Sequence, residues 1–189
     1  MIILETERLR LRTWKESDKT PYFQLNQDPK VTEFLPRSIT QDEATQFINR
    51  TNSHQERYGY SLWATELRAS NQLIGFIGLT TIEWEAPFTP AVEIGWRLAS
   101  PFWENGYATE GAKATLNYGF NHCSLTKIIS FTVPANKRSI RVMEKIGMKR
   151  DFQGDFLHPK LATTHPLAPH VLYKATQERV IHVKLFAVI

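Results

Sequence analysis

The pattern of hydrophobic and polar residues predicts strands in the first half of the chain. The segment 8–12 (RLRLR) alternates strictly between arginine and leucine, as a strand with one buried face does. Three later runs, 60–67, 72–82 and 91–98, are rich in aromatic and β-branched residues and are separated by turn-forming segments. We expect these three runs to pair in chain order as an antiparallel meander.

Helical spacing of the hydrophobic residues predicts about four helices. The first covers 16–26, and the second begins at Thr40, the first residue of a capping box (TQDE). The third is expected over 108–120, where hydrophobic side chains recur every four residues. The fourth begins at Asn136, which can cap it, and ends before Gly147, which suits the position after a helix.

These elements predict a single α+β domain over residues 1–175. A strand at 127–133 lies between the last two helices, and two more are expected around 152–156 and 171–175. The sheet is expected to be mixed but mostly antiparallel, with about six or seven strands flanked by about four helices. Residues 176–189 form a C-terminal extension to which the pattern assigns no role.

The composition favours a cytoplasmic protein without a membrane segment. Of 189 residues, 42% are hydrophobic and 22% are charged, which is typical of one soluble globular domain. The start, MIILETERLRLR, becomes charged too early for a signal peptide, and no apolar run approaches the roughly 18 residues that span a membrane. Because Cys123 is the only cysteine, an internal disulfide is excluded and a structural role is expected for this residue.

The net charge of +4 is compatible with a nucleic-acid partner and equally with a small phosphorylated ligand. Most basic residues are scattered along the sequence. The one cluster that they form is explained equally well by a solvated helix face as by a ligand-binding role. That cluster consists of Lys137, Arg138, Arg141, Lys145, Lys149 and Arg150. Because the sequence has no contiguous patch of basic and aromatic residues, direct nucleic-acid binding is not expected.

The turn before the third helix is a candidate anion site. The segment 103–109 (WENGYAT) places Gly106 and small residues where the helix begins, and no strong capping side chain precedes it. The first turn of a helix has four backbone amides without intrahelical partners and carries a partial positive charge, so a pyrophosphate fits there. The spacing matches neither GxGxxG nor GxxxxGK[ST], and simple turn chemistry is the alternative.

Three segments together resemble the GNAT acetyltransferase superfamily, and more narrowly its RimJ/RimL-type branch, which includes enzymes that acetylate ribosomal-protein N-termini. These segments are Trp96–Leu98, Trp103–Glu110 and Asn136–Met148. Glu5–Arg12 and Asp28–Leu35 also look like parts of that branch. The resemblance implies a GNAT-like fold, acetyl-CoA as cosubstrate and no metal.

The resemblance also implies which residues hold the cosubstrate. The pantetheine arm would pair with the backbone of Trp96–Leu98, and the pyrophosphate would rest on the turn at 105–109. Asn105 and Ala108 depart from the family's Q/R-x-x-G-x-G/A pattern but leave the backbone amides in place. The implied contacts are Trp96, Arg97, Leu98, Asn105, Gly106, Tyr107, Ala108, Thr109, Asn136, Arg138 and Arg141.

Acetyl transfer from a thioester to an amine needs a base, a stabilised oxyanion and an acid for the leaving thiolate. Glu93 is the candidate base, acting through water, although an exposed strand carboxylate in an ordinary surface pair is the alternative. Ser139 is the candidate acid, because Met143, where many members have a tyrosine, cannot donate a proton. Ser139 could instead serve only the first helical turn. A backbone amide near Trp96 would polarise the carbonyl.

The acceptor site is expected to involve residues late in the chain. Trp84 and Tyr173 are the candidate substrate-binding residues, and the proline-rich segment around His158 and His165 is expected near the acceptor entrance. The spacing of His158, His165 and His170 does not match a zinc motif, so no metal site is expected.

The sequence therefore predicts an acetyl-CoA-dependent N-acetyltransferase that transfers acetyl directly to a primary amine. The acceptor is a protein N-terminal α-amine or a small-molecule amine. An α-amine has a pKa near 8 and a lysine side chain one near 10.4, so a weaker base is enough to deprotonate the α-amine. A non-catalytic acyl-CoA-binding or sensing module is the alternative, and a basic nucleic-acid-binding domain is a third reading. A monomer or a homodimer is expected.

Overall fold

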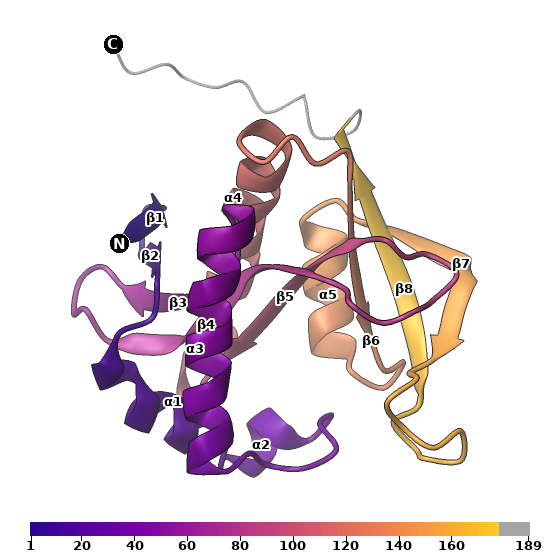
Figure 1. Cartoon of the computed structure of the whole chain (residues 1–189), viewed down its shortest axis with the longest axis horizontal. Coiled ribbons are helices and arrows are strands. Elements are labelled where there is room, and N and C mark those ends of the chain that lie inside the picture. Colours follow the sequence, from indigo (N-terminus) through magenta and orange to yellow (C-terminus); the bar gives the residue numbers. More distant parts are fainter. Residues whose placement is uncertain (178–189) are drawn as a thin grey trace.

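The computed structural model describes residues 1–177 and has an α+β architecture built on one eight-stranded sheet (Figure 1). The strand order is β1-β2-β3-β4-β5-β6-β8-β7, and every neighbouring pair is antiparallel except β5 and β6. The strands are β1 (Ile2–Glu5), β2 (Leu9–Arg12), β3 (Leu62–Leu67), β4 (Leu73–Thr81), β5 (Val92–Leu98), β6 (Lys127–Thr132), β7 (Lys149–Leu157) and β8 (Pro169–Thr176). The helices are α1 (Lys19–Leu25), α2 (Pro29–Thr32), α3 (Gln41–Tyr58), α4 (Tyr107–Asn121) and α5 (Lys137–Lys145), with 3-10 turns at Glu16–Asp18 and Ser100–Phe102.

The predicted fold class and the central meander are confirmed, and the counts need a small correction. The sheet has one strand more than expected, because the first eleven or so residues form a hairpin of β1 and β2 rather than one strand. Helix α2 was not expected; it is a single turn in which Asp28 accepts a hydrogen bond from the amide of Lys30 at 2.9 Å. Of the expected C-terminal extension 176–189, Thr176 ends β8, and 178–189 lies outside the described residues.

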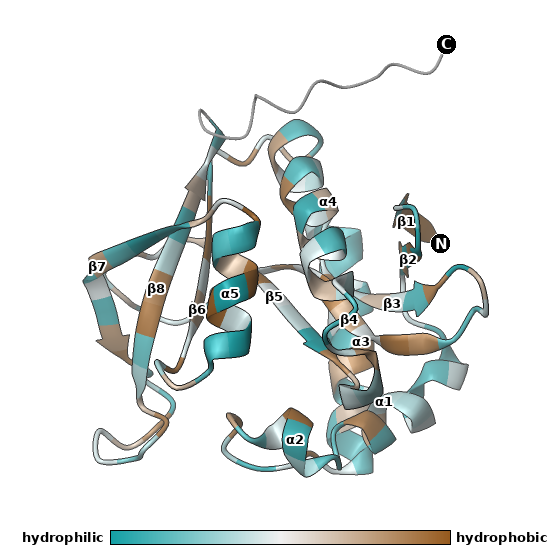
Figure 2. Ribbon diagram, turned by 180° about the vertical axis from the view of Figure 1, so that it is seen from behind, coloured by the Kyte–Doolittle hydropathy of each residue, from teal (hydrophilic) through white to brown (hydrophobic). Residues whose placement is uncertain are grey.

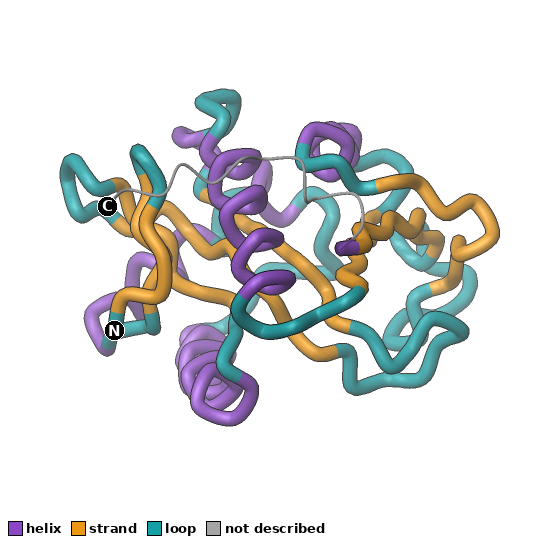
Figure 3. The backbone as a smooth tube through the Cα atoms, turned by 90° about the horizontal axis from the view of Figure 1, so that it is seen from above, coloured by secondary structure: helices purple, strands orange, loops and turns teal. Residues whose placement is uncertain are grey.

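The two faces of the sheet are covered by different helices. Helices α4 and α5 share the larger hydrophobic core with side chains such as Ile77 and Ile94, whereas α1 and α3 pack with Phe76 in a second core. Seen from above, α3 and α5 lie on opposite sides of the strands (Figure 3), and the hydropathy colouring in Figure 2 shows apolar strand segments between them. Helix α4 can lie very close to β4 because residue 111 is a glycine. A Cβ at this position would overlap the side chain of Ile77.

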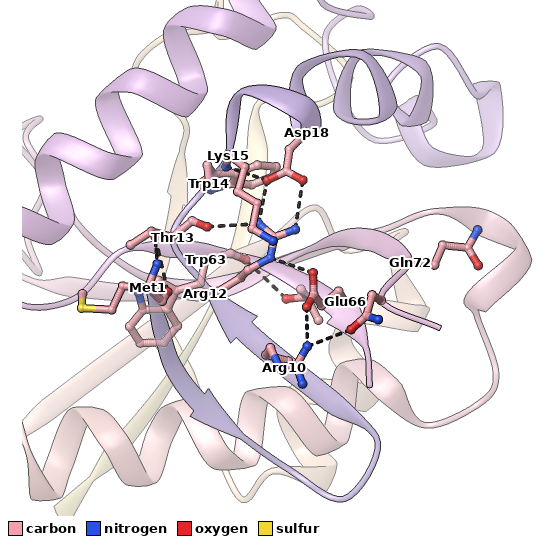
Figure 4. A network of polar contacts seen from close by, with 12 residues as sticks. Met1, Arg10, Arg12, Thr13, Trp14, Lys15, Asp18, Trp63, Glu66 and Gln72 are labelled. Atoms are coloured by element: carbon pink, nitrogen blue, oxygen red, sulfur yellow. Dashed lines mark hydrogen bonds and ion pairs between the residues drawn. The ribbon is translucent and has the colours of Figure 1, made fainter. Parts of the chain in front are cut away.

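A buried ion-pair network fixes the start of α1 against β2 and β3 (Figure 4). Arg12 donates two hydrogen bonds to Asp18, at 2.7 and 3.0 Å, and a third to Glu66 at 2.7 Å. Arg10 donates to the other oxygen of Glu66 at 2.9 Å. Burial opposes ionisation of Glu66, but the hydrogen bonds from Arg12 and Arg10 outweigh it and lower the pKa of this carboxyl. The network therefore keeps α1, and with it one wall of the central cavity, in a fixed position.

The single parallel contact of the sheet is very short. Strands β5 and β6 pair only at Val92 with Ile128 and at Glu93 with Ile129. Beyond these two pairs β5 follows β4 as far as Leu98, whereas β6 follows β8 along its length. The strands therefore separate toward their C-terminal ends and leave a wedge-shaped opening in the middle of the sheet.

Replacing Arg12 with methionine is expected to lower the free energy of unfolding by about 3–5 kcal/mol, because Asp18 and Glu66 would stay buried without their common partner. Chemical denaturation measures this loss. The matched control is Arg37→Met, which removes an exposed pair with Glu43 and should leave stability nearly unchanged. Equal effects of the two substitutions would contradict the structural role assigned to the network.

Candidate active site

The opening between β5 and β6 contains a cavity of about 1100 Å³. Its walls come from α1, α2 and the loop after it, α3, strands β4 to β6, the first turns of α4 and α5, and the loop before β8. Ligand pockets in proteins are concave and of comparable size. Nearly all residues predicted to contact a cosubstrate line this cavity, with the exception of Asn105.

The first turn of α4 has the exposed amides that the sequence predicted. Gly106 is the N-cap residue in a left-handed conformation with φ of 81°, and it provides no side chain to cap the helix. Gly106, Tyr107, Ala108 and Thr109 all line the cavity. Since a helix N-terminus carries partial positive charge, this wall can bind an anion through the backbone.

The turn before α4 is held from behind by Glu110. Its carboxylate accepts hydrogen bonds from the Thr6 hydroxyl at 2.6 Å, and from the backbone amide and Nε of Arg8 at 3.0 and 2.7 Å. Arg8 also donates to the backbone oxygen of Asn105 at 3.0 Å. The side chain of Asn105 donates to the Trp103 carbonyl, which explains why it points away from the cavity. The sequence analysis assigned no role to Glu110, because its partners lie about a hundred residues earlier.

The first turn of α5 lies on the other side of the same opening. The Asn136 side chain accepts from the Ser139 amide at 3.2 Å and donates to the Ser139 hydroxyl at 3.1 Å, so the predicted cap is confirmed. Arg138 pairs with Glu33 at 2.5 Å and lies over the Trp103 ring at 4.5 Å. Ser139, Arg138 and Arg141 line the cavity.

Glu93 lies in the cavity wall at the point where β5 and β6 part. Burial raises the pKa of its carboxyl to about 8. Within residues 1–177 the carboxyl has no ion-pair or hydrogen-bond partner, so the reading of Glu93 as a solvated surface pair is wrong. A carboxyl with this pKa exchanges protons near neutral pH, which is the property that a general base requires.

Two of the predicted substrate-binding residues do not line the cavity. Tyr173 lies on β8, where the alternation of side chains along the strand turns it toward α5. It is buried in the larger core, and its hydroxyl donates a hydrogen bond to Glu144 at 3.4 Å. Trp84 packs edge-on against Phe131 and lies 5.2 Å, centroid to centroid, from the His158 ring. Neither side chain lies in the cavity wall, and their contact with an acceptor stays a prediction.

Other side chains line this part of the cavity, and the sequence analysis missed most of them. On one side lie Tyr22, Phe47 and Phe76, which come from α1, α3 and β4 and carry no shared motif. On the other side lie His158 and His170, whose pKa values are lowered by burial, so both imidazoles are neutral near pH 7. The wall is therefore aromatic on both sides.

Two features are absent from the described part of the chain. None of its helices is long and apolar enough to cross a membrane. It contains no group of three or more His, Cys, Asp or Glu side chains that could hold a metal ion.

The sequence and the fold resemble those of known proteins. Residues 8–149 match the family model of the acetyltransferase (GNAT) domain. An uncharacterized N-acetyltransferase of Bacillus subtilis, YnaD, is 32% identical over 150 residues, which cover 78% of this chain and 83% of the relative. The crystal structure of a GNAT-family acetyltransferase from Bacillus anthracis superposes with a TM-score of 0.77 and 29% identity, covering 94% of this chain and 99% of that one. RimL, the ribosomal L7/L12 α-N-protein acetyltransferase, shares the fold with a TM-score of 0.75 at 18% identity over 93% of this chain and 98% of that chain.

The chain therefore belongs to the GNAT acetyltransferase family, and it is an acetyltransferase.

The raised pKa of Glu93 predicts a pH-dependent cost to stability. Unfolded, this carboxyl ionises near its ordinary value of 4.5, whereas folded it holds its proton up to about 8. Folding stability should therefore fall as pH rises between these values and stay level above them. The Glu93→Gln variant lacks this loss, so its melting temperature should exceed that of the parent by an amount that grows from pH 4.5 to pH 8. A difference that is constant over this range would contradict the burial of an ionisable group.

Proposed function

We propose that this protein is an acetyl-CoA-dependent N-acetyltransferase that transfers acetyl directly to a primary amine. The acceptor is a protein N-terminal α-amine or a small-molecule amine. One observation carries the proposal: a helix N-terminus with free amides and a buried carboxyl of raised pKa line the same cavity between two separated strands.

The residues present fit acetyl-CoA, the cosubstrate of the family. The uncapped amides at Gly106 to Thr109 suit its pyrophosphate, and the edge of β5 at Trp96–Leu98 has no strand partner on the β6 side among the described residues. A pantetheine arm can pair with such an edge in the way that a strand does. Asn136, Arg138 and Arg141 lie at the other wall and are proposed to contact the arm and the adenosine 3′-phosphate.

Glu93 is proposed as the general base, acting directly or through one water. When bound, the cosubstrate supplies an acetyl group activated as a thioester. Glu93, in its ionised form, takes the proton that the ammonium group of the acceptor loses. Because the pKa of Glu93 is about 8 and that of an α-amine is near 8, the transfer is nearly balanced in energy. A backbone amide of β5 near Trp96 or Arg97 donates to the carbonyl oxygen as negative charge develops on it.

Ser139 is proposed as the acid that protonates the departing thiolate. Its hydroxyl oxygen accepts a hydrogen bond from the Asn136 side chain at 3.1 Å, which leaves the hydroxyl proton free to be donated elsewhere. The Ser139 amide also donates to the Asn136 side-chain oxygen at 3.2 Å in the helix cap, so the residue serves both the helix and the proposed site.

A non-catalytic acyl-CoA sensor would need the helix N-terminus but not a buried carboxyl beside it. Burying an ionisable group without a partner costs stability, and proteins keep such groups mainly at functional sites. The position of Glu93 therefore favours catalysis.

The Glu93→Gln variant is expected to lose about 10²–10⁴-fold in kcat/KM, because glutamine cannot accept a proton. Release of free thiol from acetyl-CoA in the presence of an amine panel measures the rate, and calorimetry should show unchanged binding of coenzyme A. In the parent enzyme kcat/KM should rise with pH up to about 8, and the limb that belongs to Glu93 should be missing in the variant. Glu56→Gln, on the exposed face of α3, is the control. Full activity of Glu93→Gln would rule out this base.

The Ala108→Asp variant tests the anion site. An acidic residue in the first turn of a helix stabilises the helix, so the variant should fold normally. It should nevertheless bind coenzyme A at least about tenfold more weakly, because its charge repels the pyrophosphate and opposes the dipole that attracts it. Calorimetry measures the affinity. Ser70→Asp, in the exposed hairpin turn before β4, adds the same charge elsewhere and should bind like the parent. Unchanged affinity of Ala108→Asp would show that the phosphates bind elsewhere.

A further inference from the structure

The acceptor side of the cavity has an aromatic floor. Tyr22 and Phe47 are stacked with ring centroids 4.7 Å apart, and Phe76 lies 5.4 Å from Phe47. These rings belong to the second hydrophobic core, on the face of the sheet opposite α4 and α5. The proposed phosphate sites lie at the first turns of those two helices. The floor is therefore separate from the groups that would hold the cosubstrate's phosphates.

Two arginines lie over this floor and line the cavity. The guanidinium carbon of Arg97 is 5.5 Å from the centroid of Phe76, and that of Arg50 is 5.8 Å from the centroid of Phe47. Burial raises the pKa of the Tyr22 hydroxyl, and the positive charges of Arg97 and Arg50 both oppose that rise. The two guanidinium groups therefore both influence the same tyrosine hydroxyl.

Neither arginine has a carboxylate partner among residues 1–177. Arg97 donates one hydrogen bond to the side-chain oxygen of Asn26 at 2.6 Å, and Asn26 is fully buried and itself donates to the Tyr22 carbonyl at 2.7 Å. A neutral amide orients the guanidinium group but does not neutralise it. Arg97 keeps further N–H groups for a ligand, since a guanidinium has five.

Three acidic residues line the cavity. Glu104 lies in the turn before α4, on the side proposed for the phosphates, and the other two cannot balance the charges of Arg50 and Arg97. The Glu43 carboxylate accepts hydrogen bonds from Arg37 at 2.5 and 2.9 Å and from the Thr40 amide at 2.8 Å. The hydrogen bonds from Arg37 are the main reason that the pKa of Glu43 is lowered to about 2. Glu93 is largely protonated at pH 7, because burial raises its pKa to about 8. The acceptor side thus has an excess of positive charge over an aromatic surface.

The charge lies at a defined distance from the proposed base. Glu93 and Arg97 point to the same face of β5, with Gly95 between them and the Leu62 side chain beside Gly95. Residues four apart on a strand have Cα atoms about 13 Å apart. Both side chains are long, so a ligand of several bonds can reach from one to the other.

We infer that the acceptor of this enzyme is an amine that carries a carboxylate several bonds from the amino group, with Arg50 and Arg97 binding the carboxylate while the amine lies beside Glu93. This inference rests on the proposed function and names the acceptor class. The planar guanidinium groups match a carboxylate in two-point hydrogen bonding, and the aromatic floor holds them in place. A polyamine, which is positively charged throughout, is repelled from this site.

Matched amine pairs test the inference directly. The probes are glycyl-glutamate amide with glycyl-glutamine amide, and 4-aminobutyrate with 4-aminobutyramide, assayed with acetyl-CoA. Within at least one pair, the amine that carries a carboxylate should have a KM about tenfold or more below that of its carboxamide counterpart, since charge-assisted hydrogen bonds are strong. The preference should shrink in high salt. Equal KM values in both pairs, or a preference for the carboxamides or for spermidine, would overturn the inference.

Arginine variants locate the preference. Arg50→Gln should raise KM for the preferred carboxylate, leave the carboxamide unchanged and bind coenzyme A like the parent in calorimetry. Arg97→Gln should also raise KM for the preferred carboxylate. Arg50 has no hydrogen-bonded partner among the described residues, so its variant should fold even if Arg97→Gln does not. Arg57→Gln, on the same helix but outside the cavity lining, is the control. A preference that survives Arg50→Gln and Arg97→Gln would also overturn the inference.

The test separates this inference from the proposed function. If no amine of either pair and no neutral amine is acetylated, and coenzyme A does not bind, the proposed function fails. If carboxamides and neutral amines are acetylated as well as the carboxylates, the enzyme assignment stands and only the acceptor class is wrong.

Discussion

The site depends on the early separation of β5 and β6. The two strands share only the pairs at Val92 and Glu93 and then follow different neighbours, which leaves a free backbone edge on β5 and a cavity beside it. A parallel pair needs a crossover connection, and here the crossover is α4, whose N-terminus returns to the same opening. The strand geometry thus brings a helix N-terminus, an unpaired edge and a buried carboxyl to one place.

The charges around this cavity are divided between its two sides. Backbone amides and the basic residues of α5 form the side proposed for the cosubstrate's phosphates. Arg50 and Arg97 form the other, over rings that are positioned by α1 and α3. The network of Arg12, Asp18 and Glu66 connects α1 to the sheet, so a distant ion pair contributes to the shape of the acceptor side (Figure 4). Glu93 lies between the two sides, in the cavity wall.

Local signals in the sequence predicted most of the elements, and with them the open first turn of α4. The capping box at Thr40, the cap at Asn136 and the open turn at Gly106 depend on residues within a few positions of one another, and all three are present. The acceptor side could not be predicted in this way. The walls of this side come from elements up to about 150 residues apart in the sequence. Whether a strand residue lines the cavity depends on the face of the sheet to which its side chain points. For that reason Tyr173 was expected near the acceptor but lies in the larger core. Arg50 was not identified because it belongs to no motif.

The central claim is that coenzyme A binds along the free edge of β5 and on the first turn of α4. Backbone amide chemical shifts and hydrogen exchange, recorded with and without coenzyme A, test this claim residue by residue. The account predicts large shifts and slower exchange at Trp96–Leu98 and at Gly106 to Thr109, with little change in β1 and β7. Tight binding that left those amides unaffected, or no binding at all, would contradict it.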